Sequence, residues 1–240
     1  MIKKLLKIVA ARWPFPVLAT LKSGRKMYVD LRSGVGQGIY VTGEFDPAVF
    51  DAISSRLTSG GVFVDVGANV GYYTFCSLDL VGDTGQVHAF EIDPRPLKCL
   101  RKTVDSLKIK NVHIHNVAVS SSKGVGFLTQ ESDCGHSHVD PDGSGKRVDT
   151  ISLDLWQEDA SCDSIDVIKI DVEGGEFSVL RGAVETLKKH KPLIVFEADN
   201  DLQDRHECRV SDITELLGSI GYEVQKVEGC WSPTMVATTV

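Results

Sequence analysis

Residues 62–74 read VFVDVGANVGYYT, and this stretch decides the fold. Its first five residues are an apolar run broken only by Asp65, which predicts a buried strand. Glycines at positions 67 and 71 predict a tight turn, and a helix is expected from about Val70 to Leu80. A buried strand that leads through such a turn into a helix is the repeating unit of a parallel sheet.

The same alternation of strand and helix continues on both sides of this stretch. We expect further strands at 85–91, 112–119, 165–170 and 193–196, and a terminal hairpin formed by 222–227 and 235–240. Amphipathic helices are predicted where apolar residues recur at spacings of 3, 4 and 3. These residues are Leu97, Leu100, Val104 and Leu107 in one helix, and Phe177, Leu180, Val184 and Leu187 in another. The pattern predicts an α/β fold, with a doubly wound, mostly parallel sheet and helices on both faces.

The remaining segments are less regular. Residues 26–41 are expected to form two short strands around a glycine-rich turn, and 120–150 a loop with short β pieces. We expect a helix and β elaboration at 1–45 and one large domain at 46–240. Residues 1–18 are amphipathic and basic, which favours a helix packed on the domain or at a homodimer contact, with peripheral membrane contact as the alternative.

Composition excludes several classes of protein. The chain has 240 residues and a net charge of −7, with 42% hydrophobic and 25% charged residues, as in ordinary globular proteins. An acidic balance argues against nucleic acid as a partner. The six cysteines form no CxxC pair, and no secretory signal or membrane span is expected, so the predicted location is cytoplasmic.

The turn after the first strand carries chemical information. Its glycines follow the pattern GxxxG, whereas dinucleotide sites use GxGxxG. The carboxylate of Asp65 suits a cationic ligand such as S-adenosylmethionine and would repel a pyrophosphate. Gly67 permits close backbone approach, and Asn69 and Thr74 can hydrogen-bond an amino-acid carboxylate or orient the loop. A plain strand-to-helix turn is the structural alternative.

Two further strand ends fit an adenosine ligand. Glu91 ends the next predicted strand, 20 residues after Gly71, where an acid can accept hydrogen bonds from a ribose. Asn116, Val117 and Ala118 end the third predicted strand, where an apolar shelf with free backbone groups suits adenine.

Four segments resemble the FkbM family of class I S-adenosylmethionine-dependent methyltransferases. They are VFVDVGANVGYYTF (62–75), VHAFEIDPRP (87–96), NVAVS (116–120) and IDVIKIDVEGGEFSVLRGA (165–183). The resemblance covers about residues 40–200 and implies a seven-stranded Rossmann-like sheet. It also implies methyl transfer, usually to a hydroxyl of a sugar or secondary metabolite. The cofactor contacts that we expect are at Glu44, Asp65, Gly67, Ala68, Asn69, Gly71, Tyr73, Thr74, Glu91, Ile92, Asn116, Val117, Ala118 and Asp171.

Asp171 ends the fourth predicted strand and is the main candidate for catalysis. It could act as general base for an acceptor hydroxyl, or as a ligand to Mg²⁺ that lowers the pKa of that hydroxyl. Glu197, Asp199 and Asn200 at the next strand end could complete a site of hard oxygen ligands.

His136 and His138 lie in a segment that could form the acceptor pocket, and each is a candidate base or substrate contact. The nearby Cys134 lacks the further partners that a zinc site needs. The predicted partner is a small-molecule or saccharide hydroxyl. A nicotinamide-dependent oxidoreductase and a catalytically silent cofactor-binding module stay open as alternatives.

Overall fold

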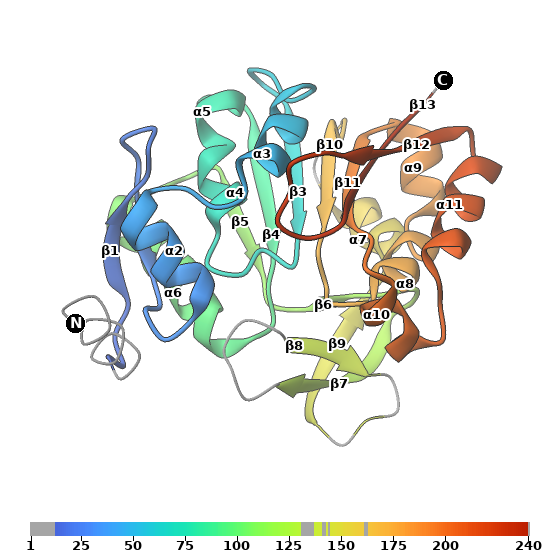
Figure 1. The fold of residues 1–240 in the computed structure, drawn as a ribbon. Helices are drawn as coiled ribbons and strands as arrows, with labels where there is room; N and C mark the ends of the chain where they lie inside the picture. Colours follow the sequence, from blue (N-terminus) through green and yellow to red (C-terminus); the bar gives the residue numbers. More distant parts are fainter. Residues whose placement is uncertain (1–12, 131–136, 141–142, 144, 161–162, 240) are drawn as a thin grey trace.

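The computed structural model describes residues 13–130, 137–140, 143, 145–160 and 163–239 (Figure 1). Its central sheet has seven strands in the order β12-β13-β11-β10-β3-β4-β5. Only β13 runs antiparallel to its neighbours within this sheet. The strands are β3 (Val62–Val66), β4 (Gln86–Phe90), β5 (Val112–His115), β10 (Val167–Ile170), β11 (Leu193–Glu197), β12 (Tyr222–Val227) and β13 (Thr234–Thr239). The predicted α/β class, the mostly parallel sheet and the terminal hairpin are confirmed.

Both faces of the central strands are buried, as a doubly covered parallel sheet requires. In β3 all five residues are buried, and successive side chains enter two different hydrophobic clusters. Phe63 packs with Val87 and Val167 in one cluster, whereas Val64 packs with Ile168 in the other. This alternation explains why the strand is a continuous apolar run in the sequence.

Helices cover the two faces of the sheet (Figure 1). The first cluster receives side chains from α2 (Gly34–Thr42), α3 (Pro47–Ser54), α4 (Tyr72–Cys76), α5 (Leu78–Val81) and α6 (Pro94–Leu107). The second receives them from α7 (Leu153–Asp159), α8 (Glu176–Arg181), α9 (Val184–His190) and α11 (Val210–Ser219). The short α10 (Asn200–Gln203) and η1 (Asp204–His206) follow β11. Two of the predicted helices are each divided into a pair of shorter ones, α4 with α5 and α8 with α9.

The region expected to be a loop with short β pieces is a second sheet of four strands. Its order is β6-β9-β7-β8, formed by β6 (Ala118–Val119), β7 (Gly124–Gln130), β8 (Ser137–Asp140) and β9 (Lys146–Ile151). The single strand predicted at 112–119 was therefore wrong, because β5 and β6 belong to different sheets. Figure 1 shows the second sheet beyond the carboxyl ends of β3 and β4.

The N-terminal elaboration is a β-hairpin followed by a helix. Strand β1 (Val17–Thr20) pairs antiparallel with β2 (Lys26–Val29), and Met27 and Val29 are fully buried in the first cluster. The second strand expected within 26–41 was wrong: Ser33 caps α2 by accepting a hydrogen bond from the Gly36 backbone. The helix predicted for 1–18 falls on 1–12, outside the described residues, and on the start of β1. Among the helices that the structure describes, none is long and apolar enough to cross a membrane.

Candidate functional site

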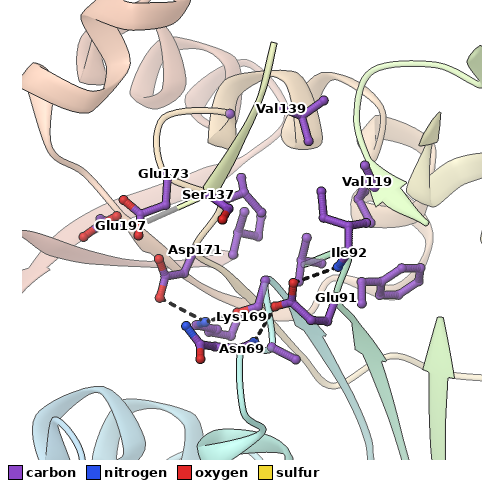
Figure 2. A pocket seen from close by; sticks show the side chains of 18 of the residues that line it. Asn69, Glu91, Ile92, Val119, Ser137, Val139, Lys169, Asp171, Glu173 and Glu197 are labelled. Carbon is purple, nitrogen blue, oxygen red and sulfur yellow. Dashed lines mark hydrogen bonds and ion pairs between the residues drawn. The ribbon is translucent and has the colours of Figure 1, made fainter. Parts of the chain in front are cut away.

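A cavity of about 990 Å³ opens at the carboxyl ends of β3, β4, β10 and β11. In an open α/β sheet this edge is where ligands bind. The cavity is bounded by the turn after β3, the end of β4 and the loop after β10, with the second sheet and η1 on the opposite side. Figure 2 shows the polar side chains that face it. The expected cofactor residues among its lining are Gly67, Ala68, Asn69, Tyr73, Glu91, Ile92, Val117, Ala118 and Asp171.

The turn after β3 requires glycine at position 67. Gly67 has φ of 77°, and a Cβ there would lie 1.8 Å from the backbone oxygen of Asp171. Its N–H and that of Ala68 donate to the Phe90 carbonyl at 3.1 and 2.9 Å, which ties the turn to the end of β4. The loop after β10 thus packs directly on the turn, with no space for a side chain between them.

Lys169 is the central cation of the site and was not among the predicted site residues. Its side chain, on β10, is 5% exposed, and its Nζ lies 3.1 Å from Asp171 Oδ2 and 3.6 Å from Asp65 Oδ1. The ammonium also donates to the Gly67 carbonyl at 3.1 Å. Burial lowers the pKa of Lys169, but the charges of Asp171 and Asp65 outweigh burial and raise it above its ordinary value. Lys169 therefore stays protonated and links β3, β10 and the turn.

Asp65 and Thr74 are buried behind the cavity wall and are not among its lining residues. The Thr74 hydroxyl donates to Asp65 Oδ2 at 2.6 Å, while the other carboxylate oxygen faces Lys169. Burial raises the pKa of Asp65, and the Lys169 charge and the Thr74 hydroxyl oppose that rise. That Asp65 and Thr74 lie near the methionine moiety of the bound cofactor stays a prediction. Gly71 also lies outside the lining.

Glu91 holds the end of β4 in a fixed conformation (Figure 2). One carboxylate oxygen accepts from the Asn69 N–H, and the other accepts from the N–H groups of Ile92 and Asp93, each at 2.7 Å. Burial raises the pKa of Glu91 to about 7, although these three backbone donors act to lower it. The side chain is 9% exposed and lines the cavity, so it meets a ligand in one defined position.

Two of the predicted cofactor contacts, Asn116 and Glu44, lie outside the lining of the cavity. Asn116 is exposed and lies outside the cavity, with its amide donating to the Glu91 carbonyl at 3.1 Å, whereas Val117 and Ala118 line the cavity. Glu44 forms a surface ion pair with Lys22 and is not among the lining residues. The acid of this segment that reaches the cavity is Asp46.

Asp46 combines burial with an unsatisfied oxygen. It is 3% exposed, has φ of 34° and lines the cavity. Its Oδ2 accepts from the Trp231 N–H at 2.7 Å, whereas its buried Oδ1 has no hydrogen-bond partner. A buried carboxylate oxygen without a partner is costly unless a ligand satisfies it.

Three carboxyl groups face the cavity beside Lys169: Asp171, Glu173 and Glu197 (Figure 2). Burial and the neighbouring charges of Asp171 and Glu173 raise the pKa of Glu197 to about 9. Its Oε2 is buried without a hydrogen-bond partner. Glu197 is therefore protonated at neutral pH and is able to donate a hydrogen bond.

The predicted Mg²⁺ ligands do not come together. Asp199 caps α10 by accepting from the Asp201 N–H, and the side chain of Asn200 accepts from the Val210 N–H. Neither lines the cavity with Asp171 and Glu197. In the described ranges no group of three or more His, Cys, Asp or Glu residues has an arrangement that could hold a metal.

Among the described residues, the histidine that lines the cavity was not predicted. His136 lies outside the described residues, and His138 is not among the lining residues. His206 of η1 lines the cavity instead, with its ring 6.0 Å from that of His138 in an edge-on contact. The sequence contains no signal for it, because His206 lies 35 positions after Asp171 and no periodic pattern relates the two residues.

The fold defines the class of protein. Solved structures with a similar fold include the methyltransferase FkbM from Methylobacillus flagellatus KT, with a TM-score of 0.53 and 19% identity over 75% of this chain and 44% of that chain. A SAM-dependent O-methyltransferase from Thermotoga maritima has a TM-score of 0.50 and 13% identity over 97% of this chain and 96% of that chain. The chain thus has the fold of class I S-adenosylmethionine-dependent methyltransferases.

The family follows from the sequence match. The family model of the methyltransferase FkbM domain matches residues 65–224, so the chain belongs to the FkbM methyltransferase family. A relative, the 2-O-methyltransferase NoeI of Sinorhizobium fredii, is 27% identical over 197 residues, which cover 74% of this chain and 79% of that protein. The predicted family and the S-adenosylmethionine-dependent methyltransferase activity are confirmed, in preference to nicotinamide-dependent oxidation.

Proposed function

We propose that this chain transfers the methyl group of S-adenosylmethionine to a hydroxyl of a saccharide or secondary metabolite. The observation that carries the proposal is that one cavity is lined by two sets of side chains of different chemistry. Glu91, Asp46 and the 67–69 turn are suited to the cofactor, whereas Asp171, Glu173 and Glu197 are suited to an acceptor. The resemblance to a relative named as a 2-O-methyltransferase supports oxygen as the acceptor atom.

The residues of the first set fit an adenosyl amino acid. We expect the ribose hydroxyls to donate to Glu91, whose carboxylate is already fixed by three backbone N–H groups. The free Oδ1 of Asp46 suits the ammonium of the methionine moiety. Ile92, Val117 and Ala118 offer an apolar surface to adenine. Asp65 and Thr74 act indirectly, by holding Lys169 and the turn.

When bound, the cofactor supplies an electrophilic methyl group on a sulfonium. The chain must then orient the acceptor hydroxyl and take up its proton. Asp171, held by Lys169 at 3.1 Å, is the proposed proton acceptor, and protonated Glu197 donates a hydrogen bond to an acceptor oxygen. Orientation of reactants can contribute about 7–11 kcal/mol, whereas a general base adds about 10²–10⁴-fold. Positioning is therefore the larger contribution.

A mass-shift assay tests the proposal. The chain is incubated with S-adenosylmethionine carrying a deuterated methyl group and with panels of saccharides and hydroxylated metabolites. We expect a deuteromethyl ether on an acceptor, equal turnover with and without a chelator, and at least about 100-fold slower turnover in Asp171→Asn. Binding of S-adenosylhomocysteine without transfer to any acceptor would instead favour the catalytically silent module, and loss of turnover with chelator would restore the magnesium hypothesis.

A further inference from the structure

A second cavity lies between helix α6 and strand β9, and the proposed methyl transfer does not use it. We call it the α6–β9 groove. Its volume of about 700 Å³ lies in the range of about 300–1,000 Å³ that is typical of sites for small ligands. Among their described lining residues the two cavities share only Ile92, so the groove is a separate space beside the end of β4.

Most of the charged side chains that line the α6–β9 groove are basic. In chain order they are Lys98, Arg101, Lys102, Asp105, Lys146, Arg147 and Asp149. Five cations and two carboxylates thus line one groove of a chain whose net charge is −7. A cleft lined mainly by one sign of charge concentrates ions of the opposite sign. We therefore expect the groove to attract anionic ligands.

The cations of α6 lie on one face of the helix. Lys98 and Lys102 are four residues apart, and Arg101 is three residues from Lys98, so all three follow the same side of the helix. Lys102 Nζ lies 4.4 Å from the centre of the Tyr28 ring, which holds this ammonium against β2. Lys98 and Arg101 are exposed, and in the described part of the chain neither forms an ion pair. Their charges are available to a ligand.

Lys146 and Arg147 line the groove from β9. Both are exposed, and neither pairs with a carboxylate among the residues that the structure describes. Asp105 and Asp149 line the same groove, yet within the described ranges no ion pair joins either of them to a cation. Two cations from each element are therefore left for an anionic ligand to neutralise.

We propose that the α6–β9 groove binds an acidic saccharide. Its carboxylate or sulfate groups pair with the two unpaired cations of α6 and the two of β9, because hydrogen bonds between ionised groups are the stronger ones in proteins. Asp105, Asn116 and Asp149 also line the groove and offer oxygen atoms that accept hydrogen bonds from sugar hydroxyls. Anionic groups and hydroxyls occur together on the rings of an acidic saccharide, and the groove has partners for both.

An acidic saccharide fits the groove better than a nucleic acid or an acidic peptide. Proteins bind single-stranded nucleic acid by stacking its bases on aromatic rings, and the described lining of the groove has no aromatic residue. An acidic peptide lacks the row of hydroxyls that would donate to the two aspartates. Beside a ligand with anionic groups alone, those aspartates would act as like charges and weaken binding.

Calorimetric titration of the full chain with octasaccharides tests the proposal. The probes are octagalacturonate, which carries carboxylates, a heparin octasaccharide, which also carries sulfates, and neutral maltooctaose. We expect saturable binding of an acidic octasaccharide and none of maltooctaose, with weaker binding as salt increases from about 0.05 to about 0.5 M, since salt screens the charges. Failure of both acidic octasaccharides to bind at low salt would overturn the proposal. No cofactor is added, so the result does not depend on methyl transfer.

Matched charge variants locate the binding site. Lys98→Gln/Arg101→Gln is compared with Arg56→Gln/Lys189→Gln, which removes the same charges at exposed positions outside the groove. Each exposed ion pair contributes up to about fivefold to affinity, so we expect about fivefold or more weaker binding of the acidic octasaccharide in the first variant. The second variant should bind within about twofold of the unmodified chain. Equal loss in the two variants would overturn the proposal.

A third variant separates recognition of a saccharide from attraction of any anion. Asp105→Ala/Asp149→Ala makes the groove more positive but removes two acceptors for sugar hydroxyls. We expect this variant to bind the acidic octasaccharide at least about twofold more weakly, because each hydrogen bond contributes about two- to tenfold. Stronger binding by this variant would overturn the proposal. So would tighter binding of octathymidylate or octaglutamate than of either acidic octasaccharide by the unmodified chain, because the ligand would then be a nucleic acid or an acidic peptide.

Discussion

The ammonium of Lys169 lies 3.1 Å from the carboxylate of Asp171, at the point where β10 ends against the glycine turn of β3. The same ammonium faces the buried Asp65 at 3.6 Å. One lysine therefore connects a carboxylate that faces the cavity with a carboxylate behind its wall. This relationship explains how the turn, the strand end and the proposed proton acceptor are held in fixed positions.

Replacing Lys169 tests this connection. Lys169→Met removes the charge that Asp65 and Asp171 share and leaves Asp65 buried without its cation. Removing one partner of a buried ion pair costs about 3–5 kcal/mol, so we expect a decrease of this size in the free energy of unfolding. The measurement is urea denaturation followed by circular dichroism. Lys169→Met/Asp65→Asn should recover part of the loss, and a cost below about 1 kcal/mol for the single variant would contradict the connection.

The contact between the two loops is tested at Gly67. In Gly67→Ala the new Cβ would lie 1.8 Å from the Asp171 backbone oxygen, at a φ of 77°. We expect a destabilisation of about 3 kcal/mol or more and loss of S-adenosylhomocysteine binding, measured by denaturation and calorimetry. Gly38→Ala is the matched control, because nothing lies within 4 Å of a Cβ there and the position is in helix α2. The control should retain binding and unfold at an equal or higher urea concentration.

Substitutions of Asp46 and Glu44 test which of these two nearby acids contacts the cofactor. In Asp46→Ala the proposed partner of the ammonium group is lost, so we expect at least about tenfold weaker binding of S-adenosylhomocysteine, which corresponds to about 1.4 kcal/mol. Glu44→Ala breaks only the surface pair with Lys22 and should bind within about twofold of the unmodified chain. A larger loss in Glu44→Ala than in Asp46→Ala would restore Glu44 as the cofactor contact.

The carboxyl of Glu197 predicts a pH dependence of stability. The folded chain keeps this proton up to about pH 9, whereas the ordinary pKa of a glutamate is 4.5. Between these values the unfolded chain binds fewer protons than the folded chain, so this group lowers stability as pH rises. Glu197→Gln cannot ionise, so relative to the unmodified chain it should gain about 5 kcal/mol of stability between pH 5 and pH 9, at about 1.4 kcal/mol for each pH unit. Parallel stability curves for the two proteins, from urea titrations at each pH, would show that Glu197 is ionised in the folded state.

The sequence predicted the sheet because its strongest signals are local. An apolar run buried on both faces, the glycine turn and the 3, 4, 3 spacing of α6 each lie within a few consecutive residues. The split of 112–119 between two sheets could not be predicted, because β6 pairs with β9 more than 30 residues later. The glycines within residues 34–42 favour a turn, yet these residues form a helix. The one local feature that indicates the helix is the capping residue Ser33.

The site residues that follow the ends of strands were predicted from the sequence. Those that tertiary packing brings to the site were missed. Glu91 and Asp171 follow apolar runs, so their position at the edge of the sheet is visible in the sequence. Lys169 lies inside such a run, and only the pairing of β10 with β3 brings it to Asp65. Similarly, Glu44 and Asp46 are two residues apart, and burial together with the backbone conformation decides which one reaches the cavity.

Calorimetric titration of the chain with S-adenosylhomocysteine tests the central claim most directly. The account predicts saturable binding at one site per chain, loss of at least about tenfold in affinity for Asp46→Ala, and no binding of NADH under the same conditions. No heat with S-adenosylhomocysteine, or saturable binding of NADH in its place, would contradict the assignment of the cavity.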